Sequence, residues 1–185
     1  MRADGFFCGM STASIMDAAA LERALTRMTH EIVENNPEPD SLAFIGIRTH
    51  GVPLAQRLAT KVSAILKREF PVGELDISMH RDDLALRHAP PQVGPSHVSF
   101  DLTGKTIVLA DDVLFTGRTI RAAMDEINDF GRPRRIQLAI LVDRGHRELP
   151  IRPDYVGKSV PTAEGERICV RLAEIDGKDE VVIER

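Results

Sequence analysis

Short apolar runs alternate with amphipathic helical segments along this chain, and that order constrains the fold more than any other feature. The run Leu42–Ile47 shows no polar alternation, which is typical of a strand covered on both faces, and Thr106–Ala110 is a second run of this kind. Apolar residues at helical spacing follow each run. This order indicates an α/β fold with a central, mostly parallel, doubly wound sheet.

Three helices are expected to cover this sheet. The first begins at Asp17, whose side chain can cap it, and ends at Asn35-Asn36-Pro37. The second begins near Pro53, and the third spans Arg118–Phe130 with Gly131 at its end. The remaining strands are expected at Leu75–Met79, Arg135–Val142, Arg167–Ile175 and Glu180–Glu184.

The 185 residues suit one domain, because a single core organises about 100–200 residues. Residues 1–16 are expected to form a disordered extension, and residues 17–185 the folded domain. The β-rich pattern from about residue 143 to 185 indicates a small hood over one edge of the sheet. Between about residues 80 and 98 the charges and prolines show no periodicity, which favours a functional loop.

Composition excludes several classes of protein. The net charge of −4 does not indicate nucleic-acid binding by the molecule as a whole, although a local basic face remains possible. Cys8 and Cys169 give neither a disulfide framework nor a zinc motif, which suits a reducing cytoplasm. No apolar run approaches the roughly 20 residues of a membrane span, so we expect no membrane partner.

Asp111 and Asp112 follow the second buried run, at the end of a strand where open α/β sheets bind ligands. Thr116, Gly117 and Thr119 then lie at the start of a helix, whose exposed N–H groups attract phosphate. Two carboxylates after a strand are often only a solvated loop. With Thr-Gly-Arg-Thr at this spacing, acceptors for a diol stand beside donors for a phosphate, as a ribose 5-phosphate requires.

The segment Ile107–Thr119 resembles the signature of type I phosphoribosyltransferases, which bind phosphoribosyl pyrophosphate (PRPP). The resemblance implies the type I phosphoribosyltransferase fold, with a flexible lid at residues 80–98. It also implies that Asp111 and Asp112 hold the ribose hydroxyls, and that Arg81 in the lid clamps pyrophosphate through its planar guanidinium. The implied PRPP- and UMP-binding residues are Arg48, Thr49, Asp111, Asp112, Val113, Leu114, Phe115, Thr116, Gly117, Arg118 and Thr119. The alternative for Arg81 is an exposed, salt-bridged loop.

Further blocks resemble the PyrR family of pyrimidine operon regulators and uracil phosphoribosyltransferases, over about residues 20–185. They are Ala24–Asn36, Leu75–Leu84, Phe130–Pro150 and Val142–Thr162. The family implies the reaction of uracil with PRPP to give UMP and pyrophosphate, with Mg²⁺ carried by PRPP. It also implies a homodimer or higher homo-oligomer. His50 and His80 depart from the Arg and Tyr that the family usually has at these positions.

The resemblance places uracil against Tyr155 and Val156, where the ring would stack on the base and the backbone would read its edge. Asp143 and Arg144 are expected to line the base or pyrophosphate side. Without the resemblance, Tyr155-Val156 would be interpreted as ordinary strand core.

PyrR proteins also bind a hairpin in the leader mRNA of pyrimidine genes, with UMP as co-regulator. The residues expected to form such an RNA face are Thr26, Arg27, His30, His146, Arg147, Arg152 and Lys158. Glu22, Glu31 and Glu34 interleave with the first of these, so a solvated, salt-bridged helix face is the alternative. A salvage enzyme without RNA-binding regulation would share every catalytic residue, and the sequence does not separate the two.

Overall fold

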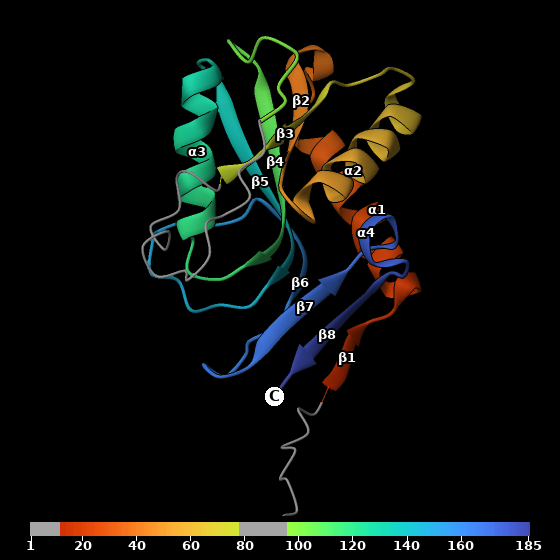
Figure 1. The fold of residues 1–185 in the computed structure, drawn as a ribbon. Coiled ribbons are helices and arrows are strands. Elements are labelled where there is room, and N and C mark those ends of the chain that lie inside the picture. Colours follow the sequence, from red (N-terminus) through yellow and green to blue (C-terminus); the bar gives the residue numbers. More distant parts are fainter. Residues whose placement is uncertain (1–11, 78–95) are drawn as a thin grey trace, which may run out of the picture.

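A computed structural model describes residues 12–77 and 96–185 (Figure 1). Five strands form the central sheet in the order β3-β2-β4-β5-β6, and every neighbouring pair is parallel. They are β2 (Leu42–Ile47), β3 (Val72–Leu75), β4 (Thr106–Leu114), β5 (Arg135–Asp143) and β6 (Tyr155–Ser159). The predicted α/β fold class is confirmed.

Helices cover both faces of this sheet (Figure 1). α1 (Ala18–Asn35) and α2 (Gly51–Leu66) pack on one face, and α3 (Arg118–Phe130) packs on the other. A short 3-10 turn (Pro39–Ser41) precedes β2. Alternate residues of β4 enter the two cores, Val108 on the α1–α2 side and Leu109 on the α3 side. Burial on both faces explains why this strand is continuously apolar.

The hood differs from the expected one. It is an antiparallel sheet in the order β1-β8-β7, formed by β1 (Thr12–Met16), β7 (Arg167–Arg171) and β8 (Glu180–Glu184), with α4 (Ala173–Asp176) between the last two. Tyr155–Ser159, expected in the hood, belongs to the central sheet, because β6 pairs in parallel with β5. Thr12–Met16 is a strand and not disordered, since β8 supplies its hydrogen-bonding partner.

Arg57 of α2 attaches the hood to the rest of the domain. Its Nε donates to Glu174 Oε1 at 2.7 Å, and its Nη1 donates to Asp179 Oδ2 at 2.9 Å. The guanidinium holds the pKa of both carboxyls below their usual range. The hood is therefore tied to α2 by charged hydrogen bonds as well as by its apolar face.

The predicted lid lies almost entirely outside the described residues. At its end, His97 forms an antiparallel bridge with Glu74 of β3, with both N–H···O distances at 2.9 Å. The strand expected at Leu75–Met79 corresponds to β3, which ends at Leu75. Within residues 12–77 and 96–185, no helix is both long and apolar enough to cross a membrane.

Candidate functional site

The parallel register brings three strand ends to one edge of the central sheet. β2 ends at Ile47, β4 at Leu114 and β5 at Asp143. Leu114 is paired directly with Asp143, and Asp111 with Ile140 one strand away. The acidic pair of β4 and the acid at the end of β5 therefore meet at the carboxyl edge, where this class of sheet binds ligands.

Backbone amides fix the orientation of the acidic pair. Asp111 is buried, and its Oδ1 accepts from the N–H of Asp112 at 2.9 Å. Asp112 is one quarter exposed; its Oδ1 accepts from the N–H of Val113 at 2.7 Å, and its Oδ2 lies 3.6 Å from His50 Nδ1. Each carboxylate thus has one oxygen fixed by the main chain.

The loop that follows leads directly into α3. Gly117 adopts the left-handed conformation with φ 94°, which favours glycine, and Thr116 Oγ1 accepts from the N–H of Arg118 at 3.4 Å. Thr116 O accepts from the N–H groups of Glu148 and Leu149 at 3.0 and 3.1 Å. The first amides of α3 have no carbonyl one turn earlier in the helix, so this loop presents donors suited to a phosphate.

Arg144 and Arg147 hold this loop against the end of β5. Arg144 is buried, its Nε donates to Thr162 Oγ1 at 2.9 Å, and its guanidinium carbon lies 4.2 Å from the centroid of the Phe115 ring. Arg147 donates to the carbonyls of Phe115, Gly145 and Ile151 and pairs with Asp143. Both arginines therefore stabilise the loops that form the candidate site.

The turn after β2 approaches the same edge. The Arg48–Thr49 peptide bond is cis, and Gly51 begins α2 directly against β4. The guanidinium of Arg48 pairs with Glu74 at 3.0 Å and Asp76 at 3.8 Å. To bind PRPP as predicted, the Arg48 guanidinium would have to do so while it is paired with these two carboxylates.

The other predicted PRPP residues fall into distinct environments. Thr49 is exposed, and Val113 and Thr119 are partly exposed. Leu114 is 1% exposed and belongs to the core, so only its backbone is accessible to a ligand. Arg81 lies outside the described residues.

The stacking role predicted for Tyr155 is contradicted by the structure. The residue is 1% exposed, packs in the core beneath α1 and lies 3.3 Å, through its hydroxyl, from Asn36 Nδ2. It pairs with Ala139, four residues before the carboxyl end of β5. Burial raises the pKa of its hydroxyl. The carbonyl of Val156, on the edge strand β6, accepts from Arg27 Nη2 of α1 at 2.9 Å.

Residues further along β6 were missed by the sequence analysis. Ser159 pairs with Asp143, and the N–H of Val160 donates to Asp143 O at 2.8 Å. Thr162 follows and anchors Arg144. The sequence contains a signal for these residues. Parallel strands end at one edge of the sheet, and Tyr155, at the start of β6, lies four residues before that edge.

The predicted RNA residues divide into two groups. The first group lies along α1 and the edge strand β6 and consists of Thr26, Arg27, His30 and Lys158. Arg27 also donates to Gly157 O at 2.7 Å, and Lys158 Nζ donates to Ile15 O at 2.9 Å. Thr26 lies beside Lys61, and His30 is exposed. Arg152 is exposed in the segment leading into β6.

The second group lies at the loop after β5. His146 Nε2 lies 2.5 Å from Thr162 O, and the ring packs edge-on against Phe115. The guanidinium of Arg147 donates hydrogen bonds to backbone carbonyls of these loops. These two residues support the loops of the candidate site, and a substitution of Arg147 would disturb them.

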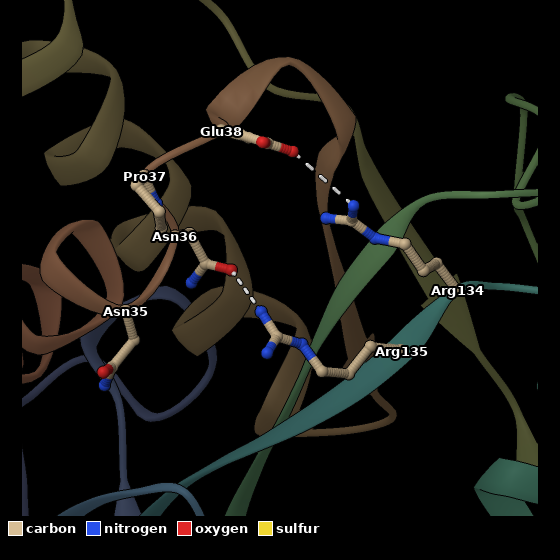
Figure 2. A pocket seen from close by; sticks show the side chains of 6 residues that line it. All are labelled: Asn35, Asn36, Pro37, Glu38, Arg134 and Arg135. Atoms are coloured by element: carbon tan, nitrogen blue, oxygen red, sulfur yellow. Dashed lines mark hydrogen bonds and ion pairs between the residues drawn. The ribbon is translucent and has the colours of Figure 1, made fainter.

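A separate pocket of about 470 Å³ lies between the end of α1 and the start of β5. Figure 2 shows Arg134 directed toward Glu38 and Arg135 directed toward Asn36. This pocket is at the amino end of the parallel strands, and the acidic pair is at their carboxyl end.

Comparison with known proteins first defines the class. Residues 11–173 match the model of the phosphoribosyl transferase domain, so the chain belongs to the phosphoribosyltransferase family. Solved structures share the fold at low sequence identity. A hypoxanthine-guanine phosphoribosyltransferase from Bacillus anthracis aligns with a TM-score of 0.72 at 15% identity, covering 96% of this chain and 99% of that one. One from Leishmania tarentolae in complex with GMP aligns with a TM-score of 0.71 at 14% identity, covering 94% and 96%.

Comparison with curated proteins identifies one family within the phosphoribosyltransferases. The protein named "Bifunctional protein PyrR" of Chloroflexus aurantiacus is 57% identical over 92% of this chain and 94% of its own length. Proteins of the same name from Thermus aquaticus (56%, covering 91% and 93%) and Clostridioides difficile (53%, covering 92% and 97%) are similar. Within the phosphoribosyltransferases the chain therefore belongs to the PyrR family, as its sequence blocks indicate.

Proposed function

We propose that this chain is a uracil phosphoribosyltransferase that converts uracil and PRPP to UMP and pyrophosphate. In the same proposal it regulates pyrimidine biosynthesis genes by UMP-dependent binding to leader mRNA. The observation that carries the enzymatic part is the adjacency of Asp111-Asp112 and the first turn of α3 at the carboxyl edge of the sheet. Carboxylates for a ribose diol and amides for a 5-phosphate then lie within one short segment.

The proposed reaction breaks the bond between ribose C1 and the pyrophosphate oxygen while uracil N1 bonds to C1 and loses its proton, which leaves with the pyrophosphate. Positive charge develops on the ribose ring as pyrophosphate leaves, in an oxocarbenium-like state as in glycoside chemistry. Asp111 and Asp112 would orient the ribose and stabilise that charge, and the loop Phe115–Gly117 with the start of α3 would fix the 5-phosphate. Catalysis would depend on positioning and electrostatics.

Mg²⁺ is proposed to enter with PRPP. Among residues 12–77 and 96–185 no group of three or more His, Cys, Asp or Glu side chains could form a metal cage. Two carboxylates at one strand end fit an ion that takes most of its ligands from substrate oxygens and water. Bound in this way, Mg²⁺ would neutralise charge on the leaving pyrophosphate.

The base is proposed to lie on the hood side of the ribose, between the ends of β5 and β6. Asp143 and Arg144 lie there, beside the segment Ser159–Thr162. We propose that this segment, and not Tyr155 and Val156, contacts the base. The loop N–H and C=O groups of this segment would read the edge of the uracil ring. Buried polar groups that pair with the correct base discriminate strongly against a base that leaves them unpaired.

The enzymatic proposal is tested by product formation. Purified chain with Mg²⁺ and PRPP should form UMP from uracil, and orotate or hypoxanthine should be poor substrates. Hypoxanthine is the demanding control, because the solved structures that share the fold include phosphoribosyltransferases for that base. Equal efficiency with hypoxanthine and uracil would refute the assignment of the base.

RNA binding is proposed along α1 and the β6 edge, where Arg27, His30 and Lys158 are exposed, together with Arg152 in the segment that leads into β6. The support is membership in the PyrR family together with these exposed basic residues on an otherwise acidic chain, although Arg27 also pairs with Glu31 at 2.7 Å. The alternative, a salvage enzyme without RNA regulation, keeps the whole active site. The exposed cations would contact phosphates, and loop bases would supply sequence recognition.

Gel-shift titration of a pyrimidine leader RNA, with and without UMP, separates these alternatives. Arg152→Gln should weaken RNA binding and lower the log–log salt slope by about 0.7–0.9 while UMP synthesis is retained. Arg121→Gln on α3 removes the same charge outside the proposed RNA-binding residues and serves as the matched control. Affinity at the non-specific level with UMP present would leave only the salvage enzyme.

A further inference from the structure

His50 stands between two carboxylates that belong to different parts of the molecule. Its Nε2 lies 3.0 Å from Asp176 Oδ2 in α4 of the hood, and its Nδ1 lies 3.6 Å from Asp112 Oδ2 at the end of β4. The three side chains are 25–29% exposed, so the contact is partly shielded from water. One imidazole therefore connects the hood with the carboxylate proposed to bind ribose.

Backbone N–H groups also hold both carboxylates, Asp176 through the oxygen that faces His50 and Asp112 through its other oxygen. The N–H of Leu172 donates to Asp176 Oδ2 at 2.9 Å, and the N–H of Val113 donates to Asp112 Oδ1 at 2.7 Å. The pKa of Asp176 is lowered, first by the Leu172 N–H and then by His50. The oxygen of Asp112 that faces His50 is the one that Val113 does not contact, so the imidazole influences its direction.

We propose that His50 is a positioning residue for PRPP, which orients Asp112 Oδ2 and couples it to the hood through Asp176. The inference rests on the proposed function, because it assumes that Asp112 binds the ribose of PRPP. Nε2 is within hydrogen-bonding distance of Asp176, whereas Nδ1 at 3.6 Å acts on Asp112 Oδ2 as a charge or dipole contact and not as a hydrogen bond. Loss of the ring frees Asp112 Oδ2 and disconnects it from the hood.

A second link joins the same part of the hood to α2 without touching Asp112. Arg57 pairs with Glu174 and Asp179, which flank Asp176 in the sequence. Arg57→Gln would loosen the attachment of the hood and leave the contact between His50 and Asp112 in place. It is the matched control that separates the positioning of Asp112 from general docking of the hood.

The test is steady-state UMP synthesis by the full chain, with PRPP varied at saturating uracil and uracil varied at saturating PRPP. His50→Gln should raise the KM for PRPP about fivefold, as expected for a coupled contact, while kcat and the KM for uracil stay within about twofold. Asp176→Asn should act in the same direction. The double variant should be no worse than His50→Gln, because both changes break the same link. Arg57→Gln should stay within about twofold of wild type for PRPP.

Three results would overturn the inference. They are an unchanged KM for PRPP in His50→Gln, an equal rise in Arg57→Gln, and fully additive effects in the double variant. An active wild type with an unchanged His50→Gln variant rejects this role for His50 alone. A wild type that forms no UMP rejects the proposed function, and the inference with it.

Discussion

Gly51 is the point at which helix α2 touches the strand that carries the acidic pair. A Cβ built on Gly51 would lie 2.4 Å from Ala110 O and 3.3 Å from the Cα of Asp111. Both neighbours are backbone atoms of β4, which is hydrogen-bonded on both sides to β2 and β5. Gly51→Ala should therefore force α2 and β4 apart directly beneath the site.

The size of the effect follows from this geometry. Ordinary contact begins at 3.4 Å, so about 1 Å of separation must be gained, and no flexible side chain can give way. Overpacking of this kind costs about 1–3 kcal/mol, and backbone neighbours place Gly51→Ala in the upper half of that range. Alanine favours the helix by at most about 1 kcal/mol, which leaves a net loss of about 2 kcal/mol. A misplacement of about 1 Å at a reacting centre can also lower turnover about a hundredfold.

The assay is guanidinium denaturation combined with UMP synthesis. Gly165→Ala is the matched control, because a Cβ at Gly165 meets nothing within 4 Å, and its stability should stay within about 0.5 kcal/mol of wild type. Equal stability and full activity of Gly51→Ala and Gly165→Ala would show that β4 and α2 are not in close contact at this point.

Three further predictions concern the site and its supports. Asp112→Asn should keep the melting temperature but lower kcat about a hundredfold, measured by UMP formation, and wild-type kinetics would refute the ribose assignment. Thr162→Val removes the acceptor of the buried Arg144 Nε, leaving Ala163 O as the acceptor of Nη2, and should lower the free energy of unfolding by about 1–3 kcal/mol; no change would mean that Nε finds another partner. The two carboxyls paired with Arg57 have pKa values below their ordinary 4.5 and 3.8, so their stabilisation is complete above about pH 4.5 and is lost as pH falls through the lowered values. Denaturation of wild type and Arg57→Gln should therefore differ near neutral pH and converge only as the pH falls through the lowered pKa values of the two carboxyls, and a constant difference would contradict this.

Local sequence signals predicted the central part of the fold well. β2 occupies the predicted Leu42–Ile47, and α3 has the predicted bounds Arg118–Phe130. Asp17 caps α1 through its Oδ1, which accepts from the N–H of Ala20 at 2.7 Å. In each case the determining interactions lie within a few residues, so periodicity and capping chemistry are sufficient.

The errors arose where distant partners decide the structure. The strand Thr12–Met16 exists because it pairs with β8 at the other end of the chain, a partner that no local pattern indicates. Tyr155 was placed beside the base because an aromatic residue suits stacking, but its level in the sheet depends on the register with β5. The roles of Arg48, the acidic pair and the loop before α3 remain predictions, because they require a bound ligand to be tested.

A crystal structure of the chain with UMP and Mg²⁺ tests the central claim most directly. We expect the ribose hydroxyls on Asp111 and Asp112, and the 5-phosphate within hydrogen-bonding distance of the Thr116–Thr119 amides. We expect uracil beside the segment Ser159–Thr162. A nucleotide bound instead at the opposite end of the sheet, in the pocket between Asn36 and Arg135, would contradict the account.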